Sequence, residues 1–132
     1  MKRIITQEDA IVHFIHKMDT EMIDAILDNG ITYYGLKKEI FIDKLQIVFD
    51  TFFSKGNNLL NSFEGVCTNC SKGCKGFSFI GNKTNNYMDL LFEIKDGKIT
   101  NIYECGSFKL NDEKIKKEGR IYLDEIIIDL SL

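Results

Sequence analysis

Residues 87–108, YMDLLFEIKDGKITNIYECGSF, contain the pattern that decides the fold. Every second residue from Met88 to Ile94 is apolar, which is the period-two pattern of a strand with one more buried face. Asp96-Gly97 separates this run from a second strand-like run at 99–108. Both central residues of a two-residue hairpin turn need positive φ, and Asp-Gly is a favoured pair there. The stretch therefore predicts an antiparallel hairpin.

The chain before this hairpin changes from helical to strand-like periodicity. Thr6 is a suitable cap for a first helix, and Asp19 or Thr20 for a second that ends at Asn29-Gly30. A short strand-like segment follows at 31–34. The longest helix is predicted at 37–55, with one wide apolar stripe. Strands are then expected at 59–66 and 76–80. The expected members of the stripe are Ile40, Phe41, Leu45, Val48, Phe49, Phe52 and Phe53.

These elements predict an α+β fold in which N-terminal helices pack against a curved, mostly antiparallel sheet. The 132 residues, 44% of them hydrophobic, suit a single domain over 1–132 whose core needs no disulfide or metal. Residues 109–132 read as a C-terminal extension. Within it, 111–119 predicts a loop or short helical turn. Residues 121–130 predict a strand that either completes the sheet or pairs with a second chain.

Charge and hydropathy exclude several classes of partner. The net charge is −3, from 17 basic and 20 acidic residues, and no basic stripe of the kind that binds nucleic acid is visible. No apolar run approaches the ~20 residues that cross a bilayer, so no membrane partner is expected. The first residues, MKRIITQED, lack the apolar core of a signal peptide. A reducing cytoplasmic location is the expectation, which favours thiols or metal ligands over disulfides.

The order of the predicted elements resembles the nuclear transport factor 2-like superfamily. The matching stretches are DTEMIDAILDNGITYYG, KEIFIDKLQIVFDTFF and FEIKDGKITNIYE, within a core of about residues 9–108. The resemblance implies a cone in which the long helix closes over a bent sheet and leaves a pocket, and a homodimer that pairs through the sheet. Isomerases, dehydratases, cyclases, transport factors and binding modules share this fold, so the resemblance implies no single activity.

The least ordinary feature is a group of cysteines. Cys67 and Cys70 form a CxxC, Cys74 follows, and Cys105 lies at the end of the hairpin. Zn²⁺ prefers four thiolate or imidazole ligands in a tetrahedron, and a CxxC turn supplies two of them. A Cys₄ zinc site would fasten the glycine-rich loop to the sheet and would leave no open position for catalysis.

Two other readings of the cysteines stay open. A strong zinc signal would be two CxxC pairs, whereas here there is one. Cys67 and Cys105 are also interpretable as small buried side chains on strands, as unliganded cysteine often is. Finally, Cys67 and Cys70 could form a redox pair, although a thioredoxin-like CxxC opens a helix and this one follows a strand.

Other side chains could carry binding or acid–base chemistry. Tyr33, Tyr34, Tyr87 and Tyr103 fall on or beside predicted strands and are candidates for lining a ligand pocket, with Asp43 or Asp89 as a possible base. The alternative is that the tyrosines pack the sheet while Asp89 faces solvent. His13 and His16 share a helix face, but no HExxH-like motif accompanies them, so partly exposed boundary residues are the simpler interpretation.

The sequence thus favours a small-ligand-binding or structural domain, with a structural zinc ion as a possible cofactor and no catalysis required. Two alternatives remain. One is an acid–base enzyme of the same fold that acts on a small organic molecule, and the other is a thiol redox sensor. An enzyme would need a deep cavity in which a carboxylate or histidine meets a tyrosine, arginine or asparagine.

Overall fold

The computed structural model describes residues 5–68, 75–104 and 106–123. Three helices precede most of the strands, as the periodicity predicts. Thr6 caps α1 by accepting a hydrogen bond from the Asp9 N–H, and Asp19 caps α2 by accepting one from the Met22 N–H. The elements are α1 (Gln7–His16), α2 (Thr20–Ile26), β1 (Thr32–Tyr33), β2 (Leu36–Lys37), α3 (Lys38–Ser54), β3 (Leu60–Cys67), β4 (Lys75–Gly81), β5 (Tyr87–Lys95), β6 (Lys98–Tyr103) and β7 (Phe108–Leu110).

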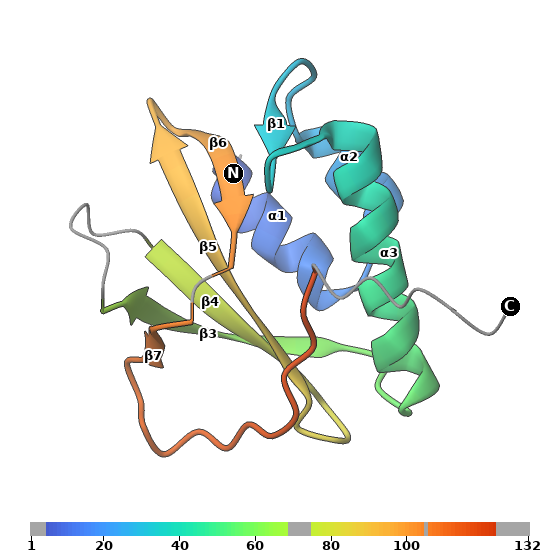
Figure 1. Ribbon diagram of the computed structural model, residues 1–132, viewed down its shortest axis with the longest axis vertical. Coiled ribbons are helices and arrows are strands. Elements are labelled where there is room, and N and C mark those ends of the chain that lie inside the picture. The colour runs from blue at the N-terminus through green and yellow to red at the C-terminus, as the bar shows by residue number, and fades with distance from the viewer. Residues whose placement is uncertain (1–4, 69–74, 105, 124–132) are drawn as a thin grey trace, which may run out of the picture.

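The main sheet has the order β6-β5-β4-β3-β7, and every neighbouring pair is antiparallel. The turn between β5 and β6 has positive φ at both Asp96 and Gly97, 53° and 77°, which confirms the predicted hairpin. In Figure 1 the three helices lie together on one side of this sheet. The α+β class predicted from the sequence is therefore confirmed.

The face of the sheet towards the helices carries the hydrophobic core. Phe77 and Phe92 lie on neighbouring strands, and their ring centroids are 5.7 Å apart. The helix α3 contributes Phe41, Phe49 and Phe52, and each of these three residues is at most 1% exposed. Interlocking aromatic rings of this kind bury much apolar surface per residue. Two expected members of the α3 stripe do not belong to it, because Ile40 and Phe53 are 47% and 46% exposed.

The expected single strand at 99–108 is wrong. The chain leaves the sheet after β6 and re-enters it as β7 on the opposite edge, where Cys67 pairs with Phe108. Gly65 and Gly76 make room for this arrangement, since a Cβ on either would collide with the Phe108 ring. Residues 99–108 have strand-like composition throughout, but composition does not show that the first half pairs with β5 and the second half with β3.

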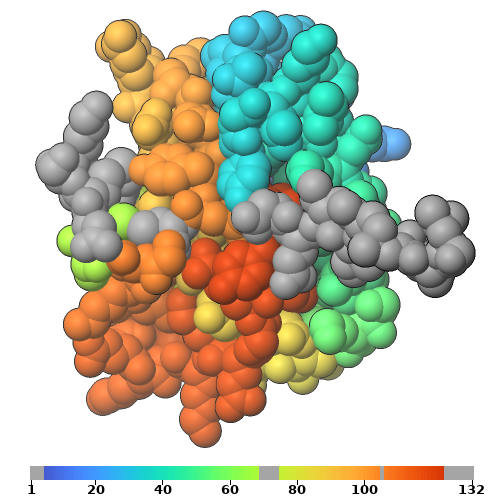
Figure 2. All heavy atoms as spheres, in the orientation of Figure 1, coloured from blue at the N-terminus to red at the C-terminus, as the bar shows by residue number. Residues whose placement is uncertain are grey.

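Residues 111–123, which we call the C-terminal strap, run back from β7 across the face of the sheet that carries Asp89. The first part is an irregular loop, one of the two forms expected for 111–119. The strap then reaches the free side of β5, where Arg120 forms a parallel bridge with Tyr87 and the Ile121 N–H donates to the Tyr87 carbonyl at 2.8 Å. Figure 2 shows β7 and the strap, orange to red, as a continuous layer over the lower part of the molecule.

The strap covers the sheet face that points away from the helices. Ser78, Ile80, Asp89 and Leu91 lie on that face and are all at most 4% exposed. The strand predicted at 121–130 is limited, within the described residues, to the neighbourhood of the Arg120 bridge, and 124–130 lie outside them. No helix in the described part of the chain is long and apolar enough to span a membrane.

Candidate functional site

Of the four predicted zinc ligands, Cys67 lies half-buried at the end of β3, while Cys70, Cys74 and Cys105 lie outside the described residues. Two described residues near these cysteines, Thr68 and Ser107, are joined to each other by hydrogen bonds. Both the N–H and the hydroxyl of Thr68 donate to the Ser107 carbonyl, at 3.1 and 3.0 Å. Residues 5–68, 75–104 and 106–123 themselves contain no group of three or more His, Cys, Asp or Glu side chains suited to a metal ion.

Two of the predicted pocket tyrosines lie near the β1–β2 turn. Tyr33 is fully buried against Phe41, and its hydroxyl donates to the Asp28 carbonyl at 3.4 Å. This burial is the main cause that raises the pKa of Tyr33 above the usual value for tyrosine. The Tyr34 hydroxyl donates to Glu104 Oε1 at 2.8 Å. These two tyrosines therefore pack and fasten the fold at this end of the sheet.

The other two, Tyr87 and Tyr103, lie on the strap-covered face, because the strand register places both opposite residues of that face. The ring of Tyr87 lies 4.5 Å from the Lys117 ammonium group, a cation–π distance. Burial first, and the nearby Asp89 carboxylate second, raise the pKa of Tyr87. The four predicted tyrosines thus fall on two sides of the sheet and do not converge on one pocket.

The two candidate acid–base residues, Asp43 and Asp89, lie in different environments. Asp43 is exposed on α3. The alternative in which Asp89 faces solvent is wrong, because the strap covers this residue and leaves it 3% exposed. Its two carboxylate oxygens each lie 3.2 Å from Lys117 Nζ, and the Ser78 hydroxyl also donates to it. Asp89 is thus committed to a buried ion pair that ties the strap to the sheet.

Both histidines make contacts within the protein. Their ring centroids are 6.4 Å apart, so the shared helix face is as expected. His13 is exposed, and His16 is half-buried with Nδ1 2.7 Å from the Leu60 carbonyl. A hydrogen bond from the Nδ1 proton to that carbonyl connects α1 to the start of β3, which is the role of a boundary residue.

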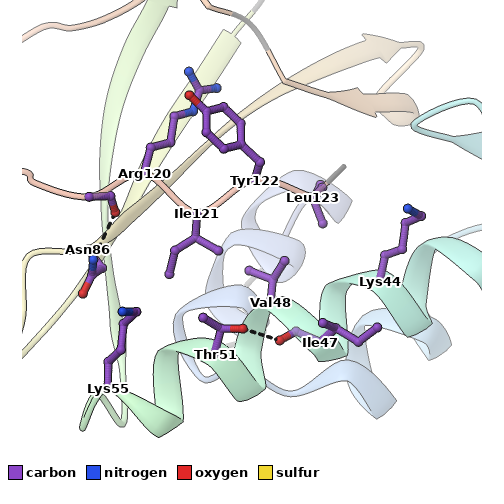
Figure 3. A pocket seen from close by; sticks show the side chains of 11 residues that line it. Lys44, Ile47, Val48, Thr51, Lys55, Asn86, Arg120, Ile121, Tyr122 and Leu123 are labelled. Atoms are coloured by element: carbon purple, nitrogen blue, oxygen red, sulfur yellow. Dashed lines mark hydrogen bonds between the residues drawn. The ribbon is translucent and has the colours of Figure 1, made fainter. Parts of the chain in front are cut away.

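A groove of about 560 Å³ opens between α3 and the strap. Its size falls within the range of small-molecule sites. Figure 3 shows Val48 pointing up from α3 and Ile121 and Leu123 pointing down from the strap, so that the two walls present apolar groups to each other. The lining residues are Lys44, Ile47, Val48, Thr51, Lys55, Asn86, Gly119, Arg120, Ile121, Tyr122 and Leu123.

The charges along this groove are of one sign. Lys44, Lys55 and Arg120 line it, and no Asp, Glu or His of the part of the chain that the structure describes does so. The Arg120 guanidinium stacks over the Tyr122 ring at 4.6 Å, and both side chains point away from α3 in Figure 3. Lys44 and Lys55 remain on the α3 side, and no ion pair in the described ranges includes either of them.

The sequence contains a pattern that corresponds to this groove, although it lies beside the more obvious apolar stripe of the core. Residues 44, 47, 48, 51 and 55 recur at spacings of three and four, so they follow one face of α3 beside the core face. Two lysines flanking Ile47 and Thr51 read as an ordinary solvent-facing side of a helix. Only the position of the strap, fixed by the Tyr87 and Asp89 contacts, turns that side into one wall of a groove.

No protein-family model, no curated protein and no solved structure matches this chain. The resemblance to the nuclear transport factor 2-like superfamily therefore stays a prediction, and the site has to be interpreted from its own geometry.

Proposed function

We propose that this protein is a binding domain whose groove between α3 and the strap takes a small, largely apolar organic ligand. The observation that supports it is the groove itself. Ile47 lines the groove and is 60% exposed, whereas Ile121 and Leu123, which line it from the strap, are buried. An apolar side chain left exposed in a concave site gains by being covered, at roughly 25 cal/mol per Å² of apolar surface removed from water.

The lining favours binding over the acid–base alternative. A general base must reach the proton that it removes, and the lining side chains that the structure describes include no carboxylate and no imidazole. Asp89, the best carboxylate candidate from the sequence, lies on the other side of the strap in its pair with Lys117. We therefore keep the enzyme of the same fold as the second candidate and binding as the first.

The test uses two isoleucines of α3. Ile47→Asp places a charge in the groove, whereas Ile40→Asp places the same charge two turns away, at a residue that is 47% exposed and outside the lining. We expect a fluorescent apolar probe to bind the parent and the Ile40→Asp variant equally and to bind the Ile47→Asp variant at least tenfold more weakly. Equal binding by the two variants would contradict the proposal.

We further propose a structural zinc ion held by Cys67, Cys70, Cys74 and Cys105. The support is the register of the described neighbours: Val66 pairs with Lys75, the residue after Cys74, and Thr68 bonds Ser107, two residues after Cys105. Four thiolates are a soft donor set of the kind that zinc prefers. When bound, the ion would supply folding energy and no reactive position.

Elemental analysis of protein purified without a metal-affinity step checks the zinc proposal. We expect close to one zinc per chain, and a loss of thermal stability with a chelator. If no metal is found and Cys67 and Cys70 become oxidised together under mild oxidant, the thiol redox sensor takes the place of the zinc site.

The dimer that the family resemblance implies is also a proposal. A dimer formed through the sheet face away from the helices would have to include the strap, because the strap already covers Ser78 and Leu91 on that face. Sedimentation analysis of the parent and of a variant with a charge on the outer surface of the strap, Lys116→Glu, would show whether this surface joins two chains.

A further inference from the structure

The groove has a charge pattern that the whole chain does not share. Acidic residues outnumber basic ones in the sequence, 20 to 17, yet among residues 5–68, 75–104 and 106–123 the groove is lined by three basic residues and no acidic one. With the Arg120 guanidinium stacked on Tyr122 and directed away from α3, the charge at the groove comes from Lys44 and Lys55. A cationic lining in an anionic protein selects for anionic ligands, because the local potential opposes the overall one.

The two lysines lie at opposite ends of the groove. They are separated by eleven positions in the sequence, which is about three helical turns, so they project from nearly the same face. At a rise of 1.5 Å per residue their Cα atoms are about 16 Å apart along the helix axis. Figure 3 shows Lys44 near Leu123 at one end and Lys55 near Asn86 at the other.

The stretch between the lysines offers little to a polar group. Its walls are Ile47 and Val48 on one side and Ile121 on the other. The Thr51 hydroxyl is already used, because it donates to the Ile47 carbonyl at 3.0 Å. The Asn86 amide likewise donates to the Gly119 carbonyl at 3.1 Å. An apolar chain therefore suits the middle of the groove better than a sugar or a nucleoside, whose hydroxyl groups would lose their hydrogen bonds to water.

From this pattern we propose that the ligand is an elongated apolar molecule with an acidic group at each end, one beside Lys44 and the other beside Lys55. This inference rests on the proposed binding function of the groove and adds the class of ligand. Lys44 is half-buried and Lys55 is exposed, so each ion pair contributes modestly, and the apolar chain provides most of the affinity.

Three probes of equal chain length test it by titration calorimetry: dodecanedioate, dodecanoate and dodecanediol, each below its aggregation concentration. We expect affinity to fall in that order, by about two- to fivefold for each carboxylate removed. Lys44→Gln and Lys55→Gln should each lower the affinity for dodecanedioate by a similar factor and leave dodecanediol unchanged. Lys95→Gln is the matched control, since Lys95 is exposed and lies outside the groove.

The outcomes separate the two proposals. If all three probes bind with equal affinity, or if the lysine variants change nothing, the groove binds apolar molecules without reading charge, and the two-headed acidic ligand is rejected. If dodecanoate and dodecanedioate bind with equal affinity, the groove recognises only one carboxylate, and the proposal is again overturned. If no probe binds the parent protein, the binding function of the groove itself fails.

Discussion

Lys117 is the single side chain that most clearly fixes the strap to the sheet. Its ammonium group lies 3.2 Å from both oxygens of Asp89 and 3.0 Å from the Ser78 hydroxyl, and it also faces the ring of Phe108 at 5.2 Å. The Asp89 side chain is only 4% exposed. A buried carboxylate is tolerated when it is paired and hydrogen-bonded, and becomes costly when its partner is removed.

We therefore expect Lys117→Met to lower the free energy of unfolding by about 3 kcal/mol, because Asp89 would be left buried without a counter-charge. Urea unfolding followed by circular dichroism measures this. Lys109→Met is the matched control, since Lys109 makes an ion pair with Glu113 in full contact with solvent, and it should unfold like the parent. Equal stability of the two variants would show that the Asp89 pair does not hold the strap.

Glycines set the register at the scale of the elements. A Cβ at Gly65 would meet the Phe108 ring and would lie 2.5 Å from the Lys109 carbonyl oxygen, which belongs to the backbone of β7. Because the Lys109 carbonyl cannot move away without disturbing the β3–β7 pairing, β7 depends on this glycine. The strap follows directly from β7, so the same glycine helps to place one wall of the groove.

Gly65→Ala should thus lower the free energy of unfolding by about 1–3 kcal/mol, the usual cost of overpacking a tightly packed site. Amide hydrogen exchange would locate the effect as faster exchange at β7 and the strap, with α3 and β5 little changed. Gly106→Ala serves for comparison, because nothing lies within 4 Å of a Cβ at that position. A uniform loss of protection, or none, would contradict this role for Gly65.

Element type was predictable wherever the cause is local. Thr6 and Asp19 cap helices through hydrogen bonds to residues three positions away, and Asp96-Gly97 adopts the hairpin turn from its own φ preferences. The path of the chain after Tyr103 was not predictable, because β7 pairs with a strand about forty residues earlier, as the register Cys67↔Phe108 shows. Contacts at that separation leave no periodic trace in the sequence.

For the candidate site too, local features were predictable from the sequence and long-range contacts were not. The tyrosines lie on or beside strands, as predicted, but the strand register, which composition does not give, decides that Tyr87 and Tyr103 occupy the face that the strap covers. Asp89 illustrates the consequence, since an alternating pattern assigns it to the outer face and only the strap makes that face buried. The groove was missed for a similar reason: Lys44 and Lys55 mark one wall of it, and the other wall comes from residues 119–123.

At the scale of the whole molecule, the strap has two surfaces with different roles. On the sheet side it completes a second layer of packing through Lys117, whose ammonium group pairs with the buried Asp89. At the β5 edge it turns Ile121 and Leu123 towards α3 and so forms the groove. The binding function that we propose depends on this second surface, which makes the location of ligand binding the central claim.

A titration of isotopically labelled protein with dodecanedioate, followed by nuclear magnetic resonance, tests that claim most directly. We expect the amide signals which shift to cluster at residues 44–55 of α3 and 119–123 of the strap, with Ile47 and Ile121 among the largest changes. Signals from β6 and from the Tyr33 region should stay in place. Shifts centred on Tyr33 and β6, or spread evenly over the protein, would show that the ligand does not bind in the groove between α3 and the strap.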